Sequence, residues 1–241
     1  MPKFFVTQDK ISDNQIIIDS EDVTHISRVL RLEKGDNVTV CDGQGTDYDA
    51  QIDTIEPKKI LLNIVSRQKS ETEPNIKVTL FQALPKASKM EYIIQKTTEL
   101  GISEIVPVKL SRCVVKIDNK KDEKKKIDRW QKIAESAGIV PTVSEFMTVN
   151  EVIEKSKEFD LFFVPYECEE QKTLKEILTS KSDVKSVGFV IGPEGGFDLS
   201  ETEKLHSSGI DTVTLGKRIL RTETAGEAVL AMTMYEIGDI N

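Results

Sequence analysis

The chain of 241 residues has little cysteine or histidine, with three of the first and two of the second. Cys41, Cys113 and Cys168 are odd in number and widely spaced, so they fit neither a disulfide framework nor the CxxC spacing of a zinc site. His25 and His206 have no cysteine or acid at ligand spacing. We therefore expect three reduced thiols and no metal site, with His206 on the surface of a helix.

Long apolar runs are also missing. No segment approaches the roughly 18 consecutive apolar residues of a membrane span, and the first residues, MPKFFVTQDK, lack the apolar stretch of a secretory signal. Apolar residues still make up 38% of the sequence, which is enough for a globular core. These features predict a soluble, cytoplasmic protein that does not contact a membrane.

Positive charge is in deficit overall, with a net charge of −8 that argues against a general nucleic-acid binder. Residues 108–132 are the exception, because they include ten basic and four acidic residues, which gives a local charge of +6. Two interpretations remain open for this stretch. It is either a solvated helix face or a patch that contacts a polyanion.

The pattern of the first seventy residues differs from that of the rest. Short β-rich runs surround a single amphipathic helix, expected at Glu21–Leu32, and together they predict a small barrel. The polar segment 66–75 contains Pro74 and is typical of a linker, so we place the domain boundary after residue 70. Residues 71–241 then alternate between apolar strands and helical segments, which predicts an α/β domain with a mainly parallel sheet covered on both faces. Its strands are expected at Lys77–Leu84, Glu104–Lys109, Leu161–Pro165, Ser186–Ile191 and Asp211–Leu215.

Four Ser/Thr-x-x-Glu patterns predict capping boxes at helix starts, with Ser88, Thr148, Ser200 and Thr224 as the caps. The helix after Thr224 is expected to place its apolar side chains on one face. These are Ala228, Val229, Met232, Met234 and Tyr235.

The usual motifs of nucleotide binding and hydrolysis are absent, since no GxGxxG, P-loop or GxSxG sequence occurs. Three segments follow late strands and precede helices, the position at which open α/β sheets bind ligands: 164–167, 191–197 and 215–225. The second contains two adjacent glycines, and the third interleaves apolar residues with three cations. This pattern alone predicts a small cofactor and a polyanion at one group of loops, without defining a reaction.

The motif IGPEGGF, followed by LGKRILRTETA, resembles the RsmE-type ribosomal RNA uracil-N3 methyltransferases of the SPOUT superfamily. The upstream blocks HISRVLRLEKGD and ALPKASKMEYIIQKTTELGISEIVPV extend the similarity along the whole chain. The resemblance implies a PUA-like β-barrel domain over residues 1–70 and a SPOUT α/β domain with a C-terminal trefoil knot over residues 71–241. It also implies S-adenosylmethionine as cofactor, a homodimer, and 16S ribosomal RNA of the small subunit as substrate, methylated at N3 of the uracil of position 1498.

Residue roles follow from combining the resemblance with the chemistry of methyl transfer. Arg221 and Glu194 are the catalytic candidates, Arg221 as a donor to the uracil oxygens and Glu194 as either base or partner of the sulfonium. The cofactor is expected at Val164, Pro165, Gly192, Pro193, Glu194, Gly195, Gly196, Leu215, Gly216, Ile219, Leu220, Thr222, Thr224 and Ala225. RNA is expected at Arg28, Arg31, Lys34, Lys86, Lys89, Arg112, Arg129 and Arg218. A branched side chain at Gly195 is expected to abolish cofactor binding.

One segment departs from the family pattern, because the chain is about half a dozen residues short near Ala137-Gly138. A true deletion there would remove a loop that faces RNA. Two other functions fit the sequence: a SPOUT methyltransferase that acts on another RNA such as tRNA, and a catalytically inactive RNA-binding module.

Overall fold

The computed structural model describes residues 2–43, 45–70, 74–117, 119–135 and 141–240. The chain divides into two compact units, Met1–Glu73 and Pro74–Asn241. The shortened segment near Ala137-Gly138 lies outside the described residues. No described helix is long and apolar enough to cross a membrane.

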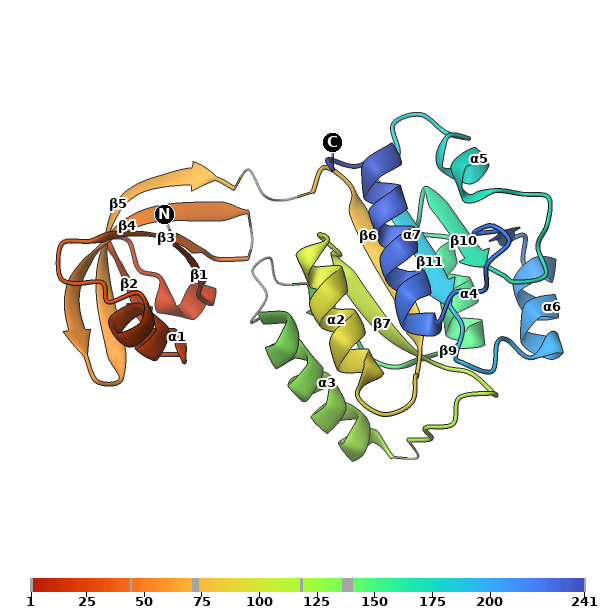
Figure 1. Cartoon of the computed structure of the whole chain (residues 1–241), viewed down its shortest axis with the longest axis horizontal. Helices are drawn as coiled ribbons and strands as arrows, with labels where there is room; N and C mark the ends of the chain where they lie inside the picture. The colour runs from red at the N-terminus through yellow and green to blue at the C-terminus, as the bar shows by residue number, and fades with distance from the viewer. Residues whose placement is uncertain (1, 44, 71–73, 118, 136–140, 241) are drawn as a thin grey trace. The chain divides into compact units, whose positions relative to one another are not determined.

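The N-terminal unit is a five-stranded sheet of order β1-β3-β4-β5-β2 (Figure 1). Its strands are β1 (Lys3–Phe5), β2 (Gln15–Ile18), β3 (Asn37–Cys41), β4 (Thr46–Glu56) and β5 (Lys59–Lys69). Pairing is antiparallel except between β1 and β3, and a short 3-10 helix, Gln8–Lys10, precedes β2. Alternate residues of β2 are buried, because one face of the sheet covers a core that contains Ile16, Ile26, Val38 and Leu62.

The helix expected at Glu21–Leu32 is shorter and less regular than predicted. It consists of α1 (Asp22–Thr24) and a π-helical turn, His25–Val29, in which the Leu30 N–H donates to the His25 carbonyl at 2.9 Å. Arg31 has a φ of 54°, and the next N–H, that of Leu32, donates to the Ile26 carbonyl at 3.0 Å. This left-handed C-terminal closure ends the helix before Leu32, a local geometry that apolar spacing does not encode.

The C-terminal unit is built on a parallel sheet of seven strands, which confirms the predicted sheet type. The order is β12-β10-β11-β6-β7-β8, with β9 also paired to β7. Its strands are β6 (Lys77–Ala83), β7 (Glu104–Lys109), β8 (Thr142–Val143), β9 (Met147–Thr148), β10 (Leu161–Pro165), β11 (Ser186–Ile191) and β12 (Asp211–Val213). The central strands are almost fully buried, as expected for a sheet covered on both sides.

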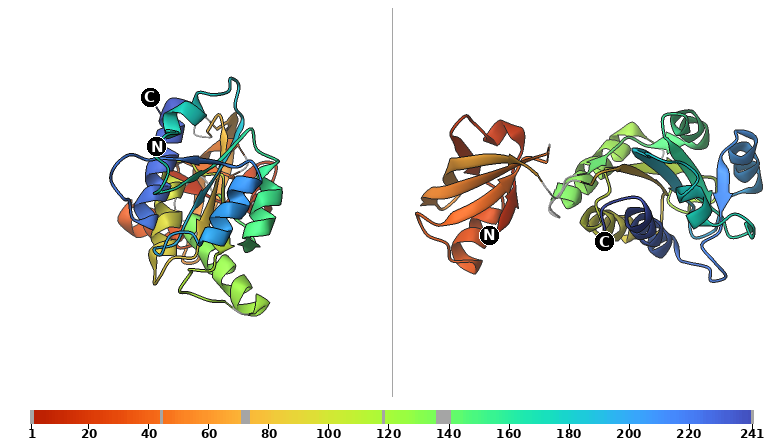
Figure 2. Two further views of the ribbon diagram at one scale, coloured as in Figure 1. Left: turned by 90° about the vertical axis from the view of Figure 1, so that its right-hand side faces the viewer. Right: turned by 90° about the horizontal axis from the view of Figure 1, so that it is seen from above.

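Helices cover both faces of this sheet. They are α2 (Lys89–Glu99), α3 (Lys120–Glu135), α4 (Val149–Ser156), α5 (Leu174–Leu178), α6 (Leu199–Ser207) and α7 (Thr222–Glu236). Helices α2 and α7 lie against each other on one face, whereas α4 lies on the other (Figures 1 and 2). Three fully buried aromatic residues, Phe81, Phe163 and Phe189, lie on the central strands, and Phe163 and Phe189 stack at 6.0 Å between ring centroids.

The capping boxes were predicted correctly at one of the four positions, Thr148 at the start of α4. Ser88 forms no side-chain cap, because its ψ of 8° is not the extended geometry of a capping residue. Helix α6 is capped by Asp198 instead of Ser200, and α7 begins before Thr224, at Thr222. A box that was not predicted, Thr173 with Glu176, opens α5.

The apolar face of α7 also differs from the prediction. Val229 and Met234 are buried as expected, but Met232 and Tyr235 are 40% and 69% exposed. Leu230 and the polar Thr233 are also buried, because they lie on the face of the helix that packs against the sheet and α2.

Candidate active site

A cavity of about 1020 Å³ lies where the chain leaves the carboxyl ends of β10, β11 and β12. Three loops and the first turn of α7 form most of its wall. The lining residues are Lys89, Pro165, Tyr166, Glu167, Glu169, Glu170, Ile191, Gly192, Pro193, Glu194, Gly196, Phe197, Thr214, Leu215, Gly216, Lys217, Arg218, Ile219, Leu220, Arg221, Thr222 and Ala225. The three segments that the sequence placed at this edge of the sheet therefore meet at one cavity.

Most of the expected cofactor residues line this cavity, and three do not. Pro165, Gly192, Pro193, Glu194, Gly196, Leu215, Gly216, Ile219, Leu220, Thr222 and Ala225 are among the lining residues. Val164 is only 2% exposed and belongs to the core of the sheet. A Cβ on Gly195 would contact Arg112, and Thr224 is exposed on the first turn of α7. These three residues stand close in the sequence to residues that do line the cavity, so sequence position alone could not show that they do not.

Two glycines of the wall have backbone conformations that other residues rarely adopt. Gly196 has a φ of 67° and Gly216 a φ of 98°. A Cβ on Gly196 would lie 2.8 Å from Glu167 Oε1, the end of an exposed, flexible side chain that can move aside. Glycine is therefore favoured at position 196 by its left-handed backbone conformation.

A buried hydrogen-bond chain fixes the start of α7 to the loop after β11. The Thr222 hydroxyl donates to the Gly192 carbonyl at 2.7 Å and accepts from Gln82 Nε2 at 3.0 Å. Gln82 is completely buried within β6, and its amide also donates to the Ala83 carbonyl at 3.0 Å. Gln82 was not predicted from the sequence, although a polar amide within an otherwise apolar strand is a signal that could have identified it.

Lys89 lies between two carboxylates in the wall of the cavity. Its ammonium is 3.0 Å from Glu223 Oε2 and 3.1 Å from Glu194 Oε1, and the Lys86 N–H donates to Glu194 Oε1 at 3.1 Å. The hydrogen bonds that Lys89 donates to Glu223 and Glu194 raise the pKa of Lys89. Burial alone would raise the pKa of Glu194 and Glu223, but backbone N–H groups and Lys89 hold both pKa values below their usual range. The structure thus places Lys89 among charged partners in the protein, although the sequence predicted it on RNA.

The loop after β10 carries three further carboxylates that line the cavity: Glu167, Glu169 and Glu170. Glu169 accepts hydrogen bonds from the Thr212 hydroxyl at 2.7 Å and from the Gln171 and Lys172 N–H groups at 2.8 and 3.2 Å. These bonds lower the pKa of Glu169 to about 2. Glu169 therefore holds its loop in place as a permanent anion, whereas Glu167 and Glu170 are exposed.

Cationic side chains gather on the segment before α7. Lys217, Arg218 and Arg221 all line the cavity and are exposed. Neither arginine forms an ion pair with another side chain in the part of the chain that the structure describes. Their guanidinium groups are available to a ligand that carries carbonyl or phosphate oxygens.

The other residues expected at RNA do not line this cavity. Arg28, Arg31 and Lys34 are exposed on the N-terminal unit, where Lys34 pairs with Asp53 at 3.1 Å. In the C-terminal unit, Arg112 donates to the Gly195 carbonyl at 3.1 Å.

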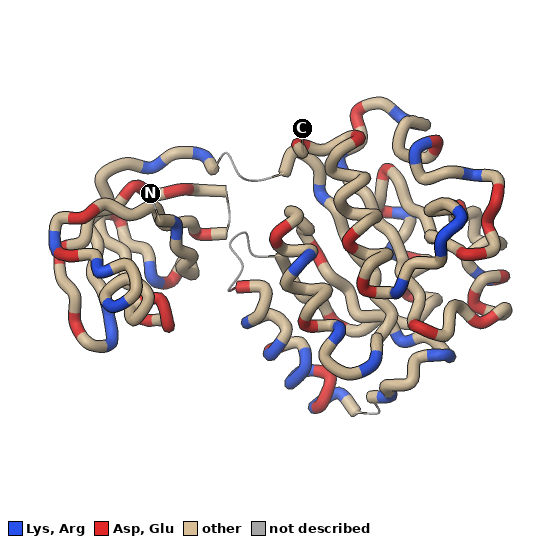
Figure 3. Tube along the Cα trace, viewed as in Figure 1, with Lys and Arg blue, Asp and Glu red and all other residues tan. Residues whose placement is uncertain are grey.

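Arg129 pairs with Glu91 at 2.7 Å and lies on α3, whose exposed side carries most of the lysines of the basic stretch (Figure 3). The opposite side of this helix buries Trp130 and Ala134.

The three cysteines are free, as predicted, with Cys41 and Cys113 buried and Cys168 exposed. His206 is exposed on α6, also as predicted. No group of three or more metal-ligating side chains occurs among the described residues.

Comparison with known families gives two matches. Residues 72–234 match the family model described as an RNA methyltransferase domain, and residues 18–65 match an RNA methyltransferase PUA domain. The first match covers more than half of the chain and contains every residue that lines the large cavity.

Similar proteins extend over nearly the whole length. The "Ribosomal RNA small subunit methyltransferase E" of Bacillus subtilis is 33% identical over 98% of this chain and 97% of its own length. The crystal structure of a protein with the same name from Neisseria gonorrhoeae, bound to S-adenosyl methionine, is 29% identical, covers all of both chains and has a TM-score of 0.86. A methyltransferase from Legionella pneumophila, also with bound cofactor, is 27% identical over 99% of this chain and 98% of its own, with a TM-score of 0.85.

Proposed function

Because this chain belongs to the RsmE-type family of ribosomal RNA methyltransferases, we propose that it transfers a methyl group from S-adenosylmethionine to 16S ribosomal RNA of the small subunit. The observation that carries the proposal is the large cavity, at which the two signature segments of the sequence converge. The finer assignment is N3 of one uracil, of the position 1498 type, and it follows from the resemblance of those segments.

The lining of the cavity suits the cofactor. Leu215, Leu220 and Ala225 offer apolar contacts for a flat base, and Gly196 presents its backbone to the cavity without a side chain. Exposed carboxylates at Glu167 and Glu170 complement a cationic ligand. When bound, S-adenosylmethionine supplies an electrophilic methyl group on a positively charged sulfur. The work of the protein is then to exclude water and to hold the accepting nitrogen in line with that methyl group.

Arg221 and Arg218 are assigned to the RNA side of the reaction. Uracil N3 becomes negatively charged when its proton leaves, and the charge spreads to the two neighbouring carbonyl oxygens. A guanidinium group can donate to such oxygens and stabilise the anion as it forms. Both arginines should avoid the sulfonium, which has the same charge.

Glu194 is better suited to an electrostatic role than to proton transfer. Its Oε1 already accepts the Lys86 N–H and faces the ammonium of Lys89, and its pKa is held below the usual range. A carboxylate with a lowered pKa accepts a proton poorly near neutral pH. We therefore assign Glu194 to fixing the loop after β11 and to balancing positive charge in the cavity.

A knot and a homodimer complete the proposal. After the edge strand β12, the chain returns across the sheet to α7, which contacts β6, β11 and α2. A knot near the cavity requires such a return of the chain, so this path supports the proposed knot.

Exposed Tyr92 on α2 and exposed Met232 and Tyr235 on α7 offer apolar surface to a second copy. RNA contacts are assigned to the exposed basic residues Arg28, Arg31, Lys34, Lys86, Arg112 and Arg129.

Three measurements, two of them on the wild type and one variant, test the proposal. Calorimetry should detect S-adenosylmethionine binding to both the wild-type protein and Arg221→Ala. Methyl transfer to small ribosomal subunits should be lost in Arg221→Ala alone, by a factor of about a hundred or more. Mass mapping of the methylated nucleosides should find 3-methyluridine. Absence of cofactor binding in the wild type would exclude the enzyme assignment, and wild-type rates in the variant would exclude the role of Arg221.

A further inference from the structure

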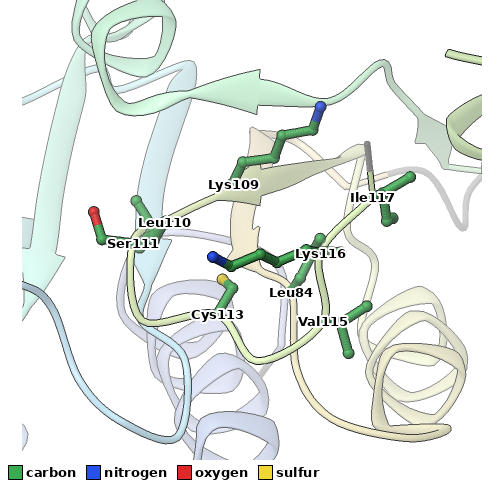
Figure 4. Close-up of a pocket in the computed structure, with 8 residues that line it drawn as sticks. All are labelled: Leu84, Lys109, Leu110, Ser111, Cys113, Val115, Lys116 and Ile117. Carbon is green, nitrogen blue, oxygen red and sulfur yellow. The ribbon is translucent and has the colours of Figure 1, made fainter. Parts of the chain in front are cut away.

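A second cavity, of about 270 Å³, lies in the segment that follows the carboxyl end of β7 (Figure 4). It is lined by Leu84, Lys109, Leu110, Ser111, Cys113, Val115, Lys116 and Ile117. None of these residues lines the large cavity. Its volume is near the lower end of the range for small-molecule pockets, roughly 300 Å³, which is too small for a whole cofactor but sufficient for a single ring with its substituents.

The floor of this second cavity is apolar, and cationic side chains flank it. Leu84, Leu110 and Cys113 are 3%, 7% and 5% exposed. Lys109 extends away from the loop, where it pairs with Glu123 and lies 5.5 Å from the centre of the Phe146 ring. Lys116 extends from the returning arm of the loop toward the opposite arm (Figure 4), and it forms no ion pair within the described residues. An apolar slot beside one available ammonium fits a nucleobase with a neighbouring phosphate.

The loop around the second cavity is fastened to the wall of the first. Arg112 donates to the Gly195 carbonyl at 3.1 Å, next to cavity-lining Glu194 and Gly196. The Ser111 N–H and hydroxyl donate to Glu201 Oε1 at 2.7 and 2.9 Å, which ties the same loop to α6. Because β7, β6 and β11 are neighbouring parallel strands, both cavities lie at the same edge of the sheet.

We propose that the second cavity holds an unpaired nucleotide of the substrate RNA, close in sequence to the methylated uracil. The base would contact Leu84, Leu110 and Val115, and the phosphate would face Lys116. A single-stranded segment is required, because bases that are splayed out of a helix expose both their faces and their edges to the protein. This inference rests on the proposed function and adds a second anchoring point on the RNA.

Adjacent valines provide a matched test. Val115 lines the cavity, whereas Val114 is 64% exposed and does not line it. Val115→Phe should fill the cavity and raise the KM for small ribosomal subunits about tenfold, the size expected for loss of one base contact. Val114→Phe should leave this KM unchanged. The affinity for S-adenosylmethionine, measured by calorimetry, should stay at the wild-type value in both variants.

A second variant decides the question even if Val115→Phe does not fold. Lys116→Ala removes an exposed charge and should weaken RNA binding, with the slope of log affinity against log salt reduced by about one. Lys175→Ala, an exposed lysine on α5, is the control and should retain the wild-type slope. An unchanged KM in folded Val115→Phe, or an unchanged slope in Lys116→Ala, would overturn the proposal. Failure of the wild-type protein to bind the cofactor would instead overturn the proposed function.

Discussion

Gly195 and Gly196 are neighbours in sequence, yet they have different surroundings. A Cβ on Gly195 would lie 3.5 Å from the Cβ of Arg112, an ordinary contact outside the large cavity. Gly196 lines the cavity, has a φ of 67° and would place a Cβ 2.8 Å from Glu167 Oε1. The expectation that a branched side chain at Gly195 blocks the cofactor stays a prediction, and the positive φ and the position in the cavity wall make Gly196 the second glycine to test.

Gly196→Ala should weaken S-adenosylmethionine binding about tenfold or more. It should also lower the free energy of unfolding by about 1 kcal/mol, since alanine must adopt a strained positive φ. Gly195→Ala is the matched control and should stay close to the wild type in both respects. Calorimetry with the cofactor and thermal unfolding measure the two effects. A larger loss of cofactor affinity in Gly195→Ala than in Gly196→Ala would contradict the assignment.

Lys89 connects α2, the loop after β11 and α7 through its two carboxylate partners. Lys89→Met should reduce methyl transfer by a factor between about ten and a hundred through misplaced loops, with the KM for RNA little changed. Lys89→Arg should recover part of the activity, because it restores the charge. If Lys89 instead held RNA, the substitution to Met would chiefly raise KM and flatten the salt dependence.

The pH dependence of stability provides a second test of Lys89. Glu194 and Glu223 have folded-state pKa values below the ordinary 4.5. Their pairing therefore adds stability that is present above pH 4.5 and is lost as the pH falls through the folded-state values. Lys89→Met should melt below the wild type near pH 7, and the two melting curves should approach each other in acid. A constant difference in melting temperature at all pH values would contradict this origin.

At the scale of elements, the sequence predicted strands better than helix ends. Glu104–Lys109, Leu161–Pro165 and Ser186–Ile191 have the predicted bounds, because buried parallel strands are continuous apolar runs. The pattern of a capping box is shared by Ser88, where no box forms, and by Thr173, where one does. The difference lies in backbone angles that are set by tertiary packing, which a four-residue pattern does not contain.

The candidate site shows the same division. The motif segments that follow the strands were predicted to form one site, because the carboxyl ends of parallel strands lie at the same edge of the sheet. Gln82 and the charge network of Lys89 were not, because their partners Thr222, Glu194 and Glu223 are more than a hundred residues away along the chain. Long-range polar pairs of this kind leave no periodic signal in the sequence.

The loop between β10 and α5 is held by hydrogen bonds to one carboxylate, that of Glu169. Glu169 accepts three hydrogen bonds, and its pKa is lowered to about 2. Its contribution to stability is present above the ordinary pKa of 4.5 and is lost as the pH falls from there toward about 2. Glu169→Gln should therefore melt below the wild type near neutral pH and match it near pH 2, with a severalfold weaker affinity for the cofactor at pH 7.

Glu170→Gln, one position along the chain, is the control for stability, since Glu170 is an exposed carboxylate. Its melting temperature should equal that of the wild type at every pH. Thermal unfolding at a series of pH values makes the comparison, and equal destabilisation by Glu169→Gln at pH 7 and pH 2 would rule out the proposed role of its ionised form.

At the scale of the whole molecule, two units have separate cores. The N-terminal core contains Ile16, Ile26 and Leu62, and the C-terminal core contains Phe81, Phe163 and Phe189. Among the described residues, all those that line the large cavity belong to the C-terminal unit. The exposed cations Arg28, Arg31 and Lys34 belong to the other unit, whose residues 18–65 match the RNA methyltransferase PUA domain. Cofactor binding and part of the RNA binding are thus assigned to different units of one chain.

Removing the N-terminal unit should separate these two activities. A protein of residues 74–241 keeps its own core and the whole cavity, so it should bind S-adenosylmethionine with the affinity of the full chain. Methyl transfer to small ribosomal subunits should fall about a hundredfold or more, because the lost phosphate contacts position the RNA. Arg28→Ala with Arg31→Ala in the full chain should reproduce part of this loss and reduce the salt dependence of binding. Calorimetry and transfer assays at several salt concentrations measure these effects, and full transfer activity in residues 74–241 would show that the N-terminal unit does not position the RNA.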